Sequence, residues 1–313
     1  MEVTKTRHSA PSSEDSLAEG PSRSQAAALW VSLRPKQWMK NLLLFAALLF
    51  SQNFFDPKMV ALTVLAFLCF CAMSSGVYLM NDIQDLESDR LHPIKRLRPI
   101  AAGELAERTA FWASVALMGG GLGASFVLNF TFGASAAIYL AVQLSYTWRL
   151  KAVVILDVFC IAAGFVIRAV AGGLVISVPI SSWLIVCAIM LSLFLALSKR
   201  RHEIVVLESE ASSHRGSLRD YSPVLLDQMI AVVTASTLMS YTLYTLSDVT
   251  TAKFGNDNLK YTIPFVLYGI LRYLYLVHQR EGGGQPEKLL LTDKPLLINI
   301  ALYVATVVLV LYL

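Results

Sequence analysis

Charged residues are scarce in this chain. Asp, Glu, Lys and Arg make up 15% of its 313 residues and apolar residues make up 56%, and the mean hydropathy is +0.58. A water-soluble domain carries about 25% charged residues, so the composition argues against an ordinary soluble protein. We therefore expect one helical domain embedded in a membrane, and no nucleic-acid partner.

The chain also lacks the cysteine spacing of a disulfide framework or a zinc site. All four cysteines lie within apolar runs, where we expect them to pack as small apolar side chains. Residues 1–26 contain no apolar core of the kind found in a secretory signal. They are rich in Ser, Ala and Glu, which predicts a disordered cytoplasmic tail before a membrane domain at 27–313.

Nine apolar stretches follow, each close to the ~20 residues that a helix needs to cross hydrocarbon. They lie near residues 39–55, 59–80, 109–128, 131–148, 152–174, 181–198, 225–247, 261–279 and 294–313. The predicted fold is an all-α bundle of nine transmembrane helices.

Basic residues are concentrated in alternate connections between these stretches, above all in the long polar connections 81–108 and 199–224. The opposite side has only Lys58, Lys253 and Lys260. By the positive-inside rule, the N-terminus and both long connections are cytoplasmic. We predict a multi-pass protein of the cell (inner) membrane, with a cytoplasmic active site and its C-terminus outside.

An acidic segment, Asn81-Asp82-Ile83-Gln84-Asp85-Leu86-Glu87-Ser88-Asp89, ends the second stretch. If the helix continues through it, Asp82, Asp85 and Asp89 share one face. Carboxylates that converge repel one another unless a cation lies between them, and such oxygen ligands suit Mg²⁺. We therefore predict Mg²⁺ ligands at Asn81, Asp82, Asp85 and Asp89. The alternative is a solvated acidic loop.

A basic run that includes Lys95 and Arg98 follows the acidic segment. It is explained either by positive-inside bias or by neutralisation of a diphosphate bound at the Mg²⁺ site. We predict substrate contacts for both residues.

The acidic segment and its position resemble the UbiA superfamily of intramembrane transferases. The likeness covers nearly everything after the tail, and it implies a cavity open to the cytoplasm in which the motif binds Mg²⁺ and a substrate diphosphate. Ordinary members of that superfamily carry a second aspartate-rich motif after the sixth span. This chain instead reads Ser198-Lys199-Arg200-Arg201-His202-Glu203 there. Three cations at one helix end suit a phosphate that arrives without its own metal, although positive-inside bias would also explain them.

Finer pieces resemble the decaprenyl-phosphate phosphoribosyltransferase branch of that superfamily. They are Arg34-Pro35-Lys36-Gln37-Trp38-Met39-Lys40-Asn41, Lys95-Arg96-Leu97-Arg98-Pro99-Ile100, Tyr146 with Leu150-Lys151, Ile167-Arg168-Ala169 with Gly172-Gly173, Lys199-Arg200 and Pro286-Glu287. The resemblance implies transfer of 5-phosphoribose from phosphoribosyl pyrophosphate to a polyprenyl phosphate, for the synthesis of cell-wall precursors. It leaves open whether the chain forms a homo-oligomer.

Ionisable residues inside the fifth stretch add to the predicted site. Asp157 and Arg168 are costly in hydrocarbon unless they face a polar cavity or a partner on a neighbouring helix. They lie about three turns apart on one face, so we expect that face to line the cavity. The full set of predicted substrate contacts is Lys36, Lys40, Asn41, Lys95, Arg98, Tyr146, Asp157, Arg168, Lys199, Arg200 and Arg201, with Asp82, Asp85 and Lys151 as catalytic residues. The alternative for Lys36 and Lys40 is a membrane-interface anchor beside Trp38.

Two other functions remain open at this level. A conventional prenyltransferase acting on an aromatic acceptor would need a second acidic cluster after the sixth span, and Glu203, Glu208 and Glu210 lack aspartate-rich spacing. A transporter for a phosphorylated lipid or anion would share the intramembrane charges but would not require the spacing of the acidic segment.

Overall fold

The structure is a computed structural model that describes residues 23–207, 220–279, 289 and 292–312. These residues form helices and their connections, with no β-strand among them. Most of the predicted tail lies outside the described residues, as do Glu208, Glu210, Pro286 and Glu287. The first helix, α1 (Gln25–Ser32), begins within the last two positions of that tail.

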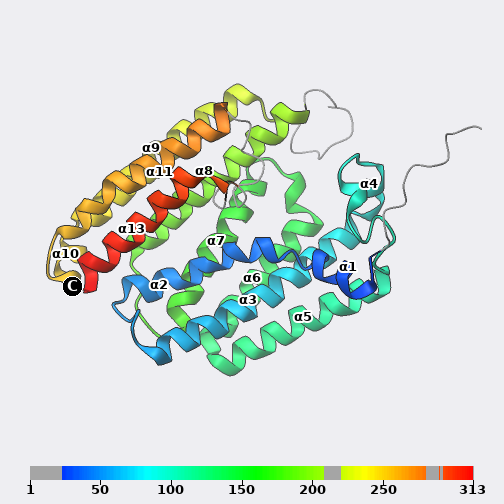
Figure 1. The fold of residues 1–313 in the computed structure, drawn as a ribbon, viewed down its shortest axis with the longest axis horizontal. Helices are drawn as coiled ribbons and strands as arrows, with labels where there is room; N and C mark the ends of the chain where they lie inside the picture. The colour runs from blue at the N-terminus through cyan, green and yellow to red at the C-terminus, as the bar shows by residue number, and fades with distance from the viewer. Residues whose placement is uncertain (1–22, 208–219, 280–288, 290–291, 313) are drawn as a thin grey trace, which may run out of the picture.

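The long helices form two groups (Figure 1), which contact each other through α7 and through α2. The N-terminal group consists of the 3₁₀ helix η1 (Pro35–Leu44), α2 (Phe45–Phe50), α3 (Pro57–Gln84), α5 (Glu107–Leu128), α6 (Phe130–Trp148) and α7 (Leu156–Val175). The C-terminal group consists of α8 (Ser182–Leu207), α9 (Pro223–Leu246), α10 (Asp248–Phe254), the 3₁₀ helix η5 (Asn258–Thr262), α11 (Ile263–Gln279) and α13 (Lys294–Tyr312). Short helices lie in the connections of the first group: α4 (Leu86–Leu91), η2 (Lys95–Leu97) and η3 (Leu150–Ala152).

Helix α7 joins the apolar cores of the two groups. Its first half contributes Val158 and Ala162 to a core shared with α8, α9 and α11. Its second half contributes Ala171 and Val175 to a core shared with η1, α2, α3 and α6. Helix α7 is therefore packed against the C-terminal group along its first half and against the N-terminal group along its second half.

Six of the described helices are long and apolar enough to cross a membrane, namely α3, α5, α7, α8, α9 and α13. This confirms the prediction of an all-helical, multi-pass membrane protein. The predicted spans 39–55, 131–148 and 261–279 coincide with η1 and α2, with α6, and with α11. These elements are shorter or less apolar than the other six, so the count of nine spans stays a prediction.

Gly172 brings α7 into direct contact with the backbone at the end of η1. A Cβ atom built on Gly172 would lie 2.1 Å from the carbonyl oxygen of Leu44, well inside van der Waals contact. The glycine that follows Arg168 by one turn thus permits the close approach of these two elements.

We expect Gly172→Ala to lower the free energy of unfolding by roughly 1–3 kcal/mol, because η1 and α7 must separate to admit the methyl group. Thermal unfolding in detergent should show a lower midpoint. The matched control is Gly120→Ala on α5, where a Cβ atom meets nothing within 4 Å. Equal midpoints for the two variants would contradict this packing.

Candidate active site

The acidic segment forms a break between two helices. Helix α3 ends at Gln84 and α4 begins at Leu86, with Asp85 at the junction. Backbone hydrogen bonds still span the break, because the amide of Asp85 donates to Asn81 (2.9 Å) and the amide of Asp89 donates to Asp85 (2.8 Å). The three aspartates therefore lie on two successive helices and their junction, and not on the single continuous helix that the predicted spacing assumed.

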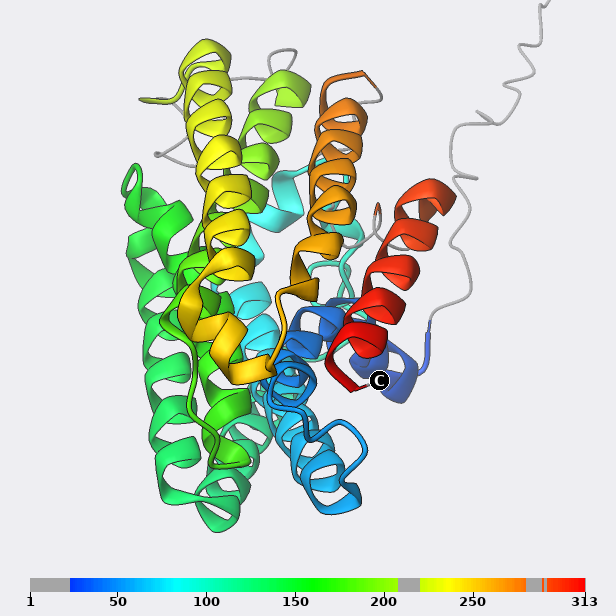
Figure 2. The same cartoon turned by 90° about the vertical axis from the view of Figure 1, so that its left-hand side faces the viewer.

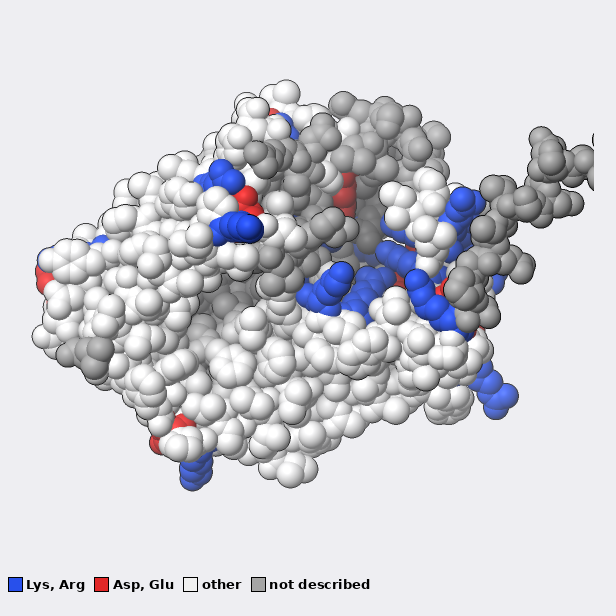
Figure 3. Space-filling model, in the orientation of Figure 1, with Lys and Arg blue, Asp and Glu red and all other residues white. Residues whose placement is uncertain are grey.

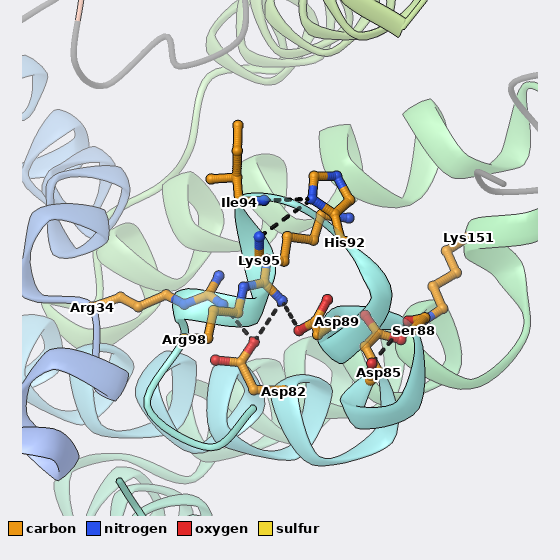
Figure 4. Close-up of polar contacts among 10 residues, drawn as sticks. All are labelled: Arg34, Asp82, Asp85, Ser88, Asp89, His92, Ile94, Lys95, Arg98 and Lys151. Carbon is orange, nitrogen blue, oxygen red and sulfur yellow. Dashed lines mark hydrogen bonds and ion pairs between the residues drawn. The ribbon is translucent and has the colours of Figure 1, made fainter. Parts of the chain in front are cut away.

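Asp82 and Asp89 meet at a single guanidinium group (Figure 4). Nη1 of Arg98 donates to Oδ1 of Asp82 at 3.1 Å and to Oδ2 of Asp89 at 2.5 Å. Both carboxylates are buried, and a buried carboxylate is costly unless it is paired. Arg98, predicted as a substrate contact, holds these two acidic side chains together in this structure.

Asp85 faces a different cation. Its Oδ1 accepts a hydrogen bond of 2.6 Å from Nζ of Lys151, which lies on η3 between α6 and α7. The contact joins residues 66 positions apart in the chain. The structure thus brings together Asp85 and Lys151, both of which were predicted to be catalytic.

Arg34 is a member of this site that sequence reasoning missed. Its Nη2 donates to Oδ1 of Asp82 at 2.5 Å, and its guanidinium lies 5.0 Å from the centre of the Tyr78 ring. Its backbone has φ +54°, which is uncommon for a residue with a side chain and often marks a functional site. In the sequence, Arg34 drew attention only as the first residue of the piece that ends at Asn41, although an arginine directly before a proline at the membrane boundary was a usable signal.

His92, three residues after Asp89, was also overlooked. Its Nδ1 accepts hydrogen bonds from the backbone amides of Ile94 (3.1 Å) and Lys95 (3.3 Å). His92 thereby orders the start of η2, which carries Lys95. These hydrogen bonds give the imidazole ring of His92 a structural role in the loop.

A second polar group links α6, α7, α8 and the residues just before α9, and its centre is Arg200. Nε of Arg200 donates to Oδ2 of Asp157 at 2.6 Å, and Nη2 donates to the hydroxyl of Tyr146 at 3.1 Å. Nη1 pairs with Glu203. Arg200 is 1% exposed and Asp157 is 0% exposed. Protein partners enclose this guanidinium, which favours a structural role for Asp157 and Arg200 over contact with a phosphate or a ribose.

Tyr221 completes this second group. Its hydroxyl donates to Oδ1 of Asp157 at 3.0 Å and accepts from the amide of Ile155 at 2.7 Å. Burial raises the pKa of Tyr221 to about 12, so the hydroxyl keeps the proton that it donates at neutral pH. Ile155 has φ +69°, a strained conformation for a β-branched residue, and the hydrogen bond from its amide to Tyr221 helps to hold it.

Arg168 is enclosed by protein partners as well. It donates to Oδ1 of Asn41 (2.7 Å), to the carbonyl of Gly164 (2.7 Å) and to the hydroxyl of Tyr139 (2.8 Å). Asn41 is itself fully buried and donates to Ser74 on α3. Arg168 therefore reaches η1 while Asp157 reaches α8, and the cavity-lining face predicted for this pair is filled by contacts with neighbouring helices.

The other predicted residues are more accessible. Lys36 is exposed, and Lys40, Asn81, Lys95 and Lys199 are half-buried. Arg201 pairs with Asp227 on α9, which also contacts His278 on α11. Figure 3 shows Lys and Arg gathered around a hollow on the side of the molecule where α1 and α4 lie, while most of that face is uncharged.

The donor chemistry of the acidic segment fits a hard divalent cation. Among the residues that the structure describes, no group of three His, Cys, Asp or Glu side chains is arranged to hold a metal, and Arg34, Arg98 and Lys151 occupy the carboxylates. Asp82 and Asp89 nevertheless face each other across one cationic nitrogen. This pair accommodates positive charge between its oxygens, and Mg²⁺ needs only one or two carboxylates when substrate phosphates supply further ligands.

Comparison with known proteins places this geometry in context. Residues 42–293 match the model of the UbiA prenyltransferase family. The decaprenyl-phosphate phosphoribosyltransferase of Corynebacterium glutamicum is 35% identical over 96% of this chain and 91% of its own length. The enzyme of the same name from Mycolicibacterium smegmatis is 35% identical over 95% of this chain and 96% of its own length. A UbiA homologue from Archaeoglobus fulgidus, solved with GPP and Mg²⁺ bound, superposes with a TM-score of 0.69 at 19% identity and covers 91% of this chain and all of that one.

Proposed function

The chain belongs to the UbiA prenyltransferase family, and on that premise we propose that it transfers 5-phosphoribose from phosphoribosyl pyrophosphate to a polyprenyl phosphate of the decaprenyl type, with release of pyrophosphate. The observation that carries this choice is the distribution of charge. One site pairs the acidic segment with Arg34, Arg98 and Lys151. The described end of α8 instead carries Lys199, Arg200 and Arg201, of which Arg200 and Arg201 pair with carboxylates and Lys199 is half-buried. The names of the two relatives support phosphoribosyl as the transferred group and decaprenyl phosphate as the acceptor.

The acidic site is assigned to the diphosphate end of the donor. Mg²⁺ held by Asp82, Asp85 and Asp89, with Asn81 beside them, would supply positive charge to the leaving pyrophosphate. Arg34, Arg98 and Lys151 contact these carboxylates in this structure and would be available to bind the phosphate oxygens if a metal took their place on the carboxylates. Cations fixed beside the leaving group stabilise the charge that develops as the C1–O bond breaks.

The acceptor needs little activation. Its nucleophile is a phosphate oxygen that is already ionised at neutral pH, so no strong general base is required. Lys36, Lys40 and Lys199 are accessible and are assigned to the 5-phosphate of the donor and the phosphate of the lipid. Both sites lie on the cytoplasmic side under the predicted orientation, where a soluble sugar diphosphate is available.

A donor-choice assay tests this function. Purified protein in detergent with Mg²⁺ is given ribose-labelled phosphoribosyl pyrophosphate and a polyprenyl phosphate, or prenyl diphosphate and an aromatic acid. We expect a labelled lipid from the first pair and no prenylated ring from the second. The reverse result would establish a conventional prenyltransferase and overturn the proposal.

Arg34→Gln should lower kcat by about 10²-fold, the cost of removing one preorganised charge-stabilising group. The matched control is Arg23→Gln, which removes an exposed arginine paired with Glu104. Steady-state kinetics with both substrates saturating would measure the effect. Equal kcat values for the two variants would exclude Arg34 from the site.

A further inference from the structure

One face of α3 holds Arg34 in place. The segment that contains Arg34, from α1 to η1 (dark blue to blue), lies against α3 (Figure 1 and Figure 2). Ser75, Tyr78 and Asp82 occupy positions i, i+3 and i+7 of α3, which places them on the same face of that helix. Each of them contacts Arg34 or the residue directly before it.

Ser75 holds the backbone that carries Arg34. Ser75 is 1% exposed, and its hydroxyl donates to the carbonyl oxygen of Leu33 at 2.9 Å. The same hydroxyl accepts a hydrogen bond of 3.0 Å from Nε1 of Trp38. One side chain of α3 therefore fixes the chain on both sides of Arg34, one residue before it and four residues after it.

The residue between these two contacts is strained. Arg34 has φ +54° and ψ +60°, a left-handed conformation that a residue with a side chain seldom adopts and that persists when the surrounding structure holds it. Pro35 follows and restricts the backbone of Arg34 further. If the carbonyl of Leu33 were released, the backbone would be free to relax, and the direction of the arginine side chain would change with it.

The guanidinium of Arg34 is held at two further points. It lies 5.0 Å from the centre of the Tyr78 ring, within the range of a cation–π contact. Its Nη2 donates to Oδ1 of Asp82 at 2.5 Å (Figure 4). About two turns of α3 thus fix the backbone, the ring contact and the hydrogen-bonded end of a single arginine.

We propose that Ser75 is a positioning residue of the candidate active site, which keeps Arg34 in its left-handed conformation and so directs the guanidinium towards the leaving diphosphate. The role of Arg34 at the diphosphate rests on the proposed function; the hold of Ser75 on Leu33 does not. The competing explanation is that Ser75 only fastens η1 to α3. Its loss would then lower stability and would act independently of Arg34.

A double-mutant cycle separates the two explanations. The full-length protein is purified in detergent as wild type, Ser75→Ala, Arg34→Gln and the double variant. Binding of pyrophosphate in the presence of Mg²⁺ is measured by titration calorimetry, alongside kcat, because pyrophosphate carries the charge of the proposed leaving group. A misplaced group costs up to about 10²-fold. Ser75→Ala leaves the contacts with Tyr78 and Asp82, so we expect about tenfold weaker binding and about tenfold lower kcat.

The double variant gives the decisive comparison. If Ser75 acts through Arg34, adding Ser75→Ala to Arg34→Gln should cause no further loss of binding or of kcat. Independent effects would multiply instead.

Ser114→Ala is the matched control. Ser114 is also a buried serine whose hydroxyl donates to a backbone carbonyl of α3, that of Gly76 at 2.7 Å. Its loss should lower the thermal midpoint by a similar amount and leave pyrophosphate binding and kcat near the wild-type values. Ser75→Thr keeps the hydroxyl and should recover most of what Ser75→Ala loses.

Tyr78 tests the same hold if Ser75→Ala does not fold. Tyr78→Leu removes the ring beside the guanidinium and should weaken pyrophosphate binding about fivefold, whereas Tyr78→Phe keeps the ring and should bind as the wild type does. The loss in Tyr78→Leu should also disappear when Arg34→Gln is already present. Equal binding by the two Tyr78 variants would contradict the hold.

Wild-type binding and kcat in Ser75→Ala, or losses that multiply in the double variant, would overturn the proposal. Pyrophosphate binding does not depend on which group is transferred. A protein that shows the expected cycle but transfers no phosphoribose would therefore refute the proposed function and leave the role of Ser75 standing. Phosphoribosyl transfer at full kcat by Ser75→Ala would do the opposite.

Discussion

Asp85→Asn should reduce turnover by about 10³-fold, at the upper end of what one preorganised electrostatic contact contributes, while the protein stays folded. Asparagine keeps the shape of the side chain and removes the charge that would bind Mg²⁺. The cost in stability is small because Asp85 and Lys151 are only part-buried, with side chains 21% and 17% exposed, so water can solvate Lys151 once its partner is neutral.

A matched variant lies two residues away. Glu87→Gln removes the same charge from the same acidic segment, but the Glu87 side chain is 91% exposed and contacts only Arg90 at 3.5 Å among the ion pairs of the described residues. Its turnover should stay within a factor of about two of the wild type, as expected for an exposed ion pair. Rates are compared at saturating donor and Mg²⁺, with membrane insertion and thermal unfolding as folding controls. Full activity of Asp85→Asn would remove this residue from the catalytic site.

Asp157→Asn should lower the free energy of unfolding by about 3–5 kcal/mol, because it leaves Arg200 buried without one of its charged partners. Arg200 is 1% exposed, so water cannot replace the lost carboxylate. Thermal unfolding in detergent measures the change. Asp248→Asn, at an exposed position on α10, is the control and should shift the midpoint little.

A double variant separates a structural role from a phosphate-binding role. Asp157→Leu combined with Arg200→Met replaces the buried pair by apolar side chains of similar size, and such replacements recover much of the lost stability. Recovery of both stability and donor affinity would show that Arg200 acts through packing. Recovery of stability with loss of donor affinity would instead support the phosphate contact predicted from the sequence.

Long apolar runs made the membrane fold predictable. In lipid the backbone N–H and C=O groups of such a run must be hydrogen-bonded within the protein, and a helix pairs them within the run itself. The first predicted span, 39–55, begins inside η1, a 3₁₀ helix that carries Lys36, Lys40 and Asn41. Asn41 is buried with distant partners: its Oδ1 accepts from Arg168, 127 residues away, and its Nδ2 donates to Ser74. A pairing of that range depends on how α7 packs against η1, which local sequence does not encode.

For the candidate site, the sequence predicted which residues take part but not how they pair. The spacing of Asp82, Asp85 and Asp89 predicted one site, and the basic run predicted a role there for Arg98, which contacts Asp82 and Asp89 in the structure. Spacing does not determine which cation pairs with which carboxylate, and Arg34 reaches Asp82 from 48 residues away. The same holds at the end of α8. The sequence of a basic run does not distinguish guanidinium groups that face solvent from one that, like Arg200, faces a buried aspartate.

The central claim is that the pentosyl group moves while the diphosphate leaves, and a double-label experiment tests it most directly. Phosphoribosyl pyrophosphate labelled separately at the 5-phosphate and at the terminal phosphate of the diphosphate is incubated with the protein, Mg²⁺ and a polyprenyl phosphate, and the lipid and aqueous products are separated. We predict that the 5-phosphate label enters the lipid in a one-to-one ratio with ribose and that the terminal label leaves as pyrophosphate. Terminal label in the lipid, or no label in the lipid at all, would contradict the account.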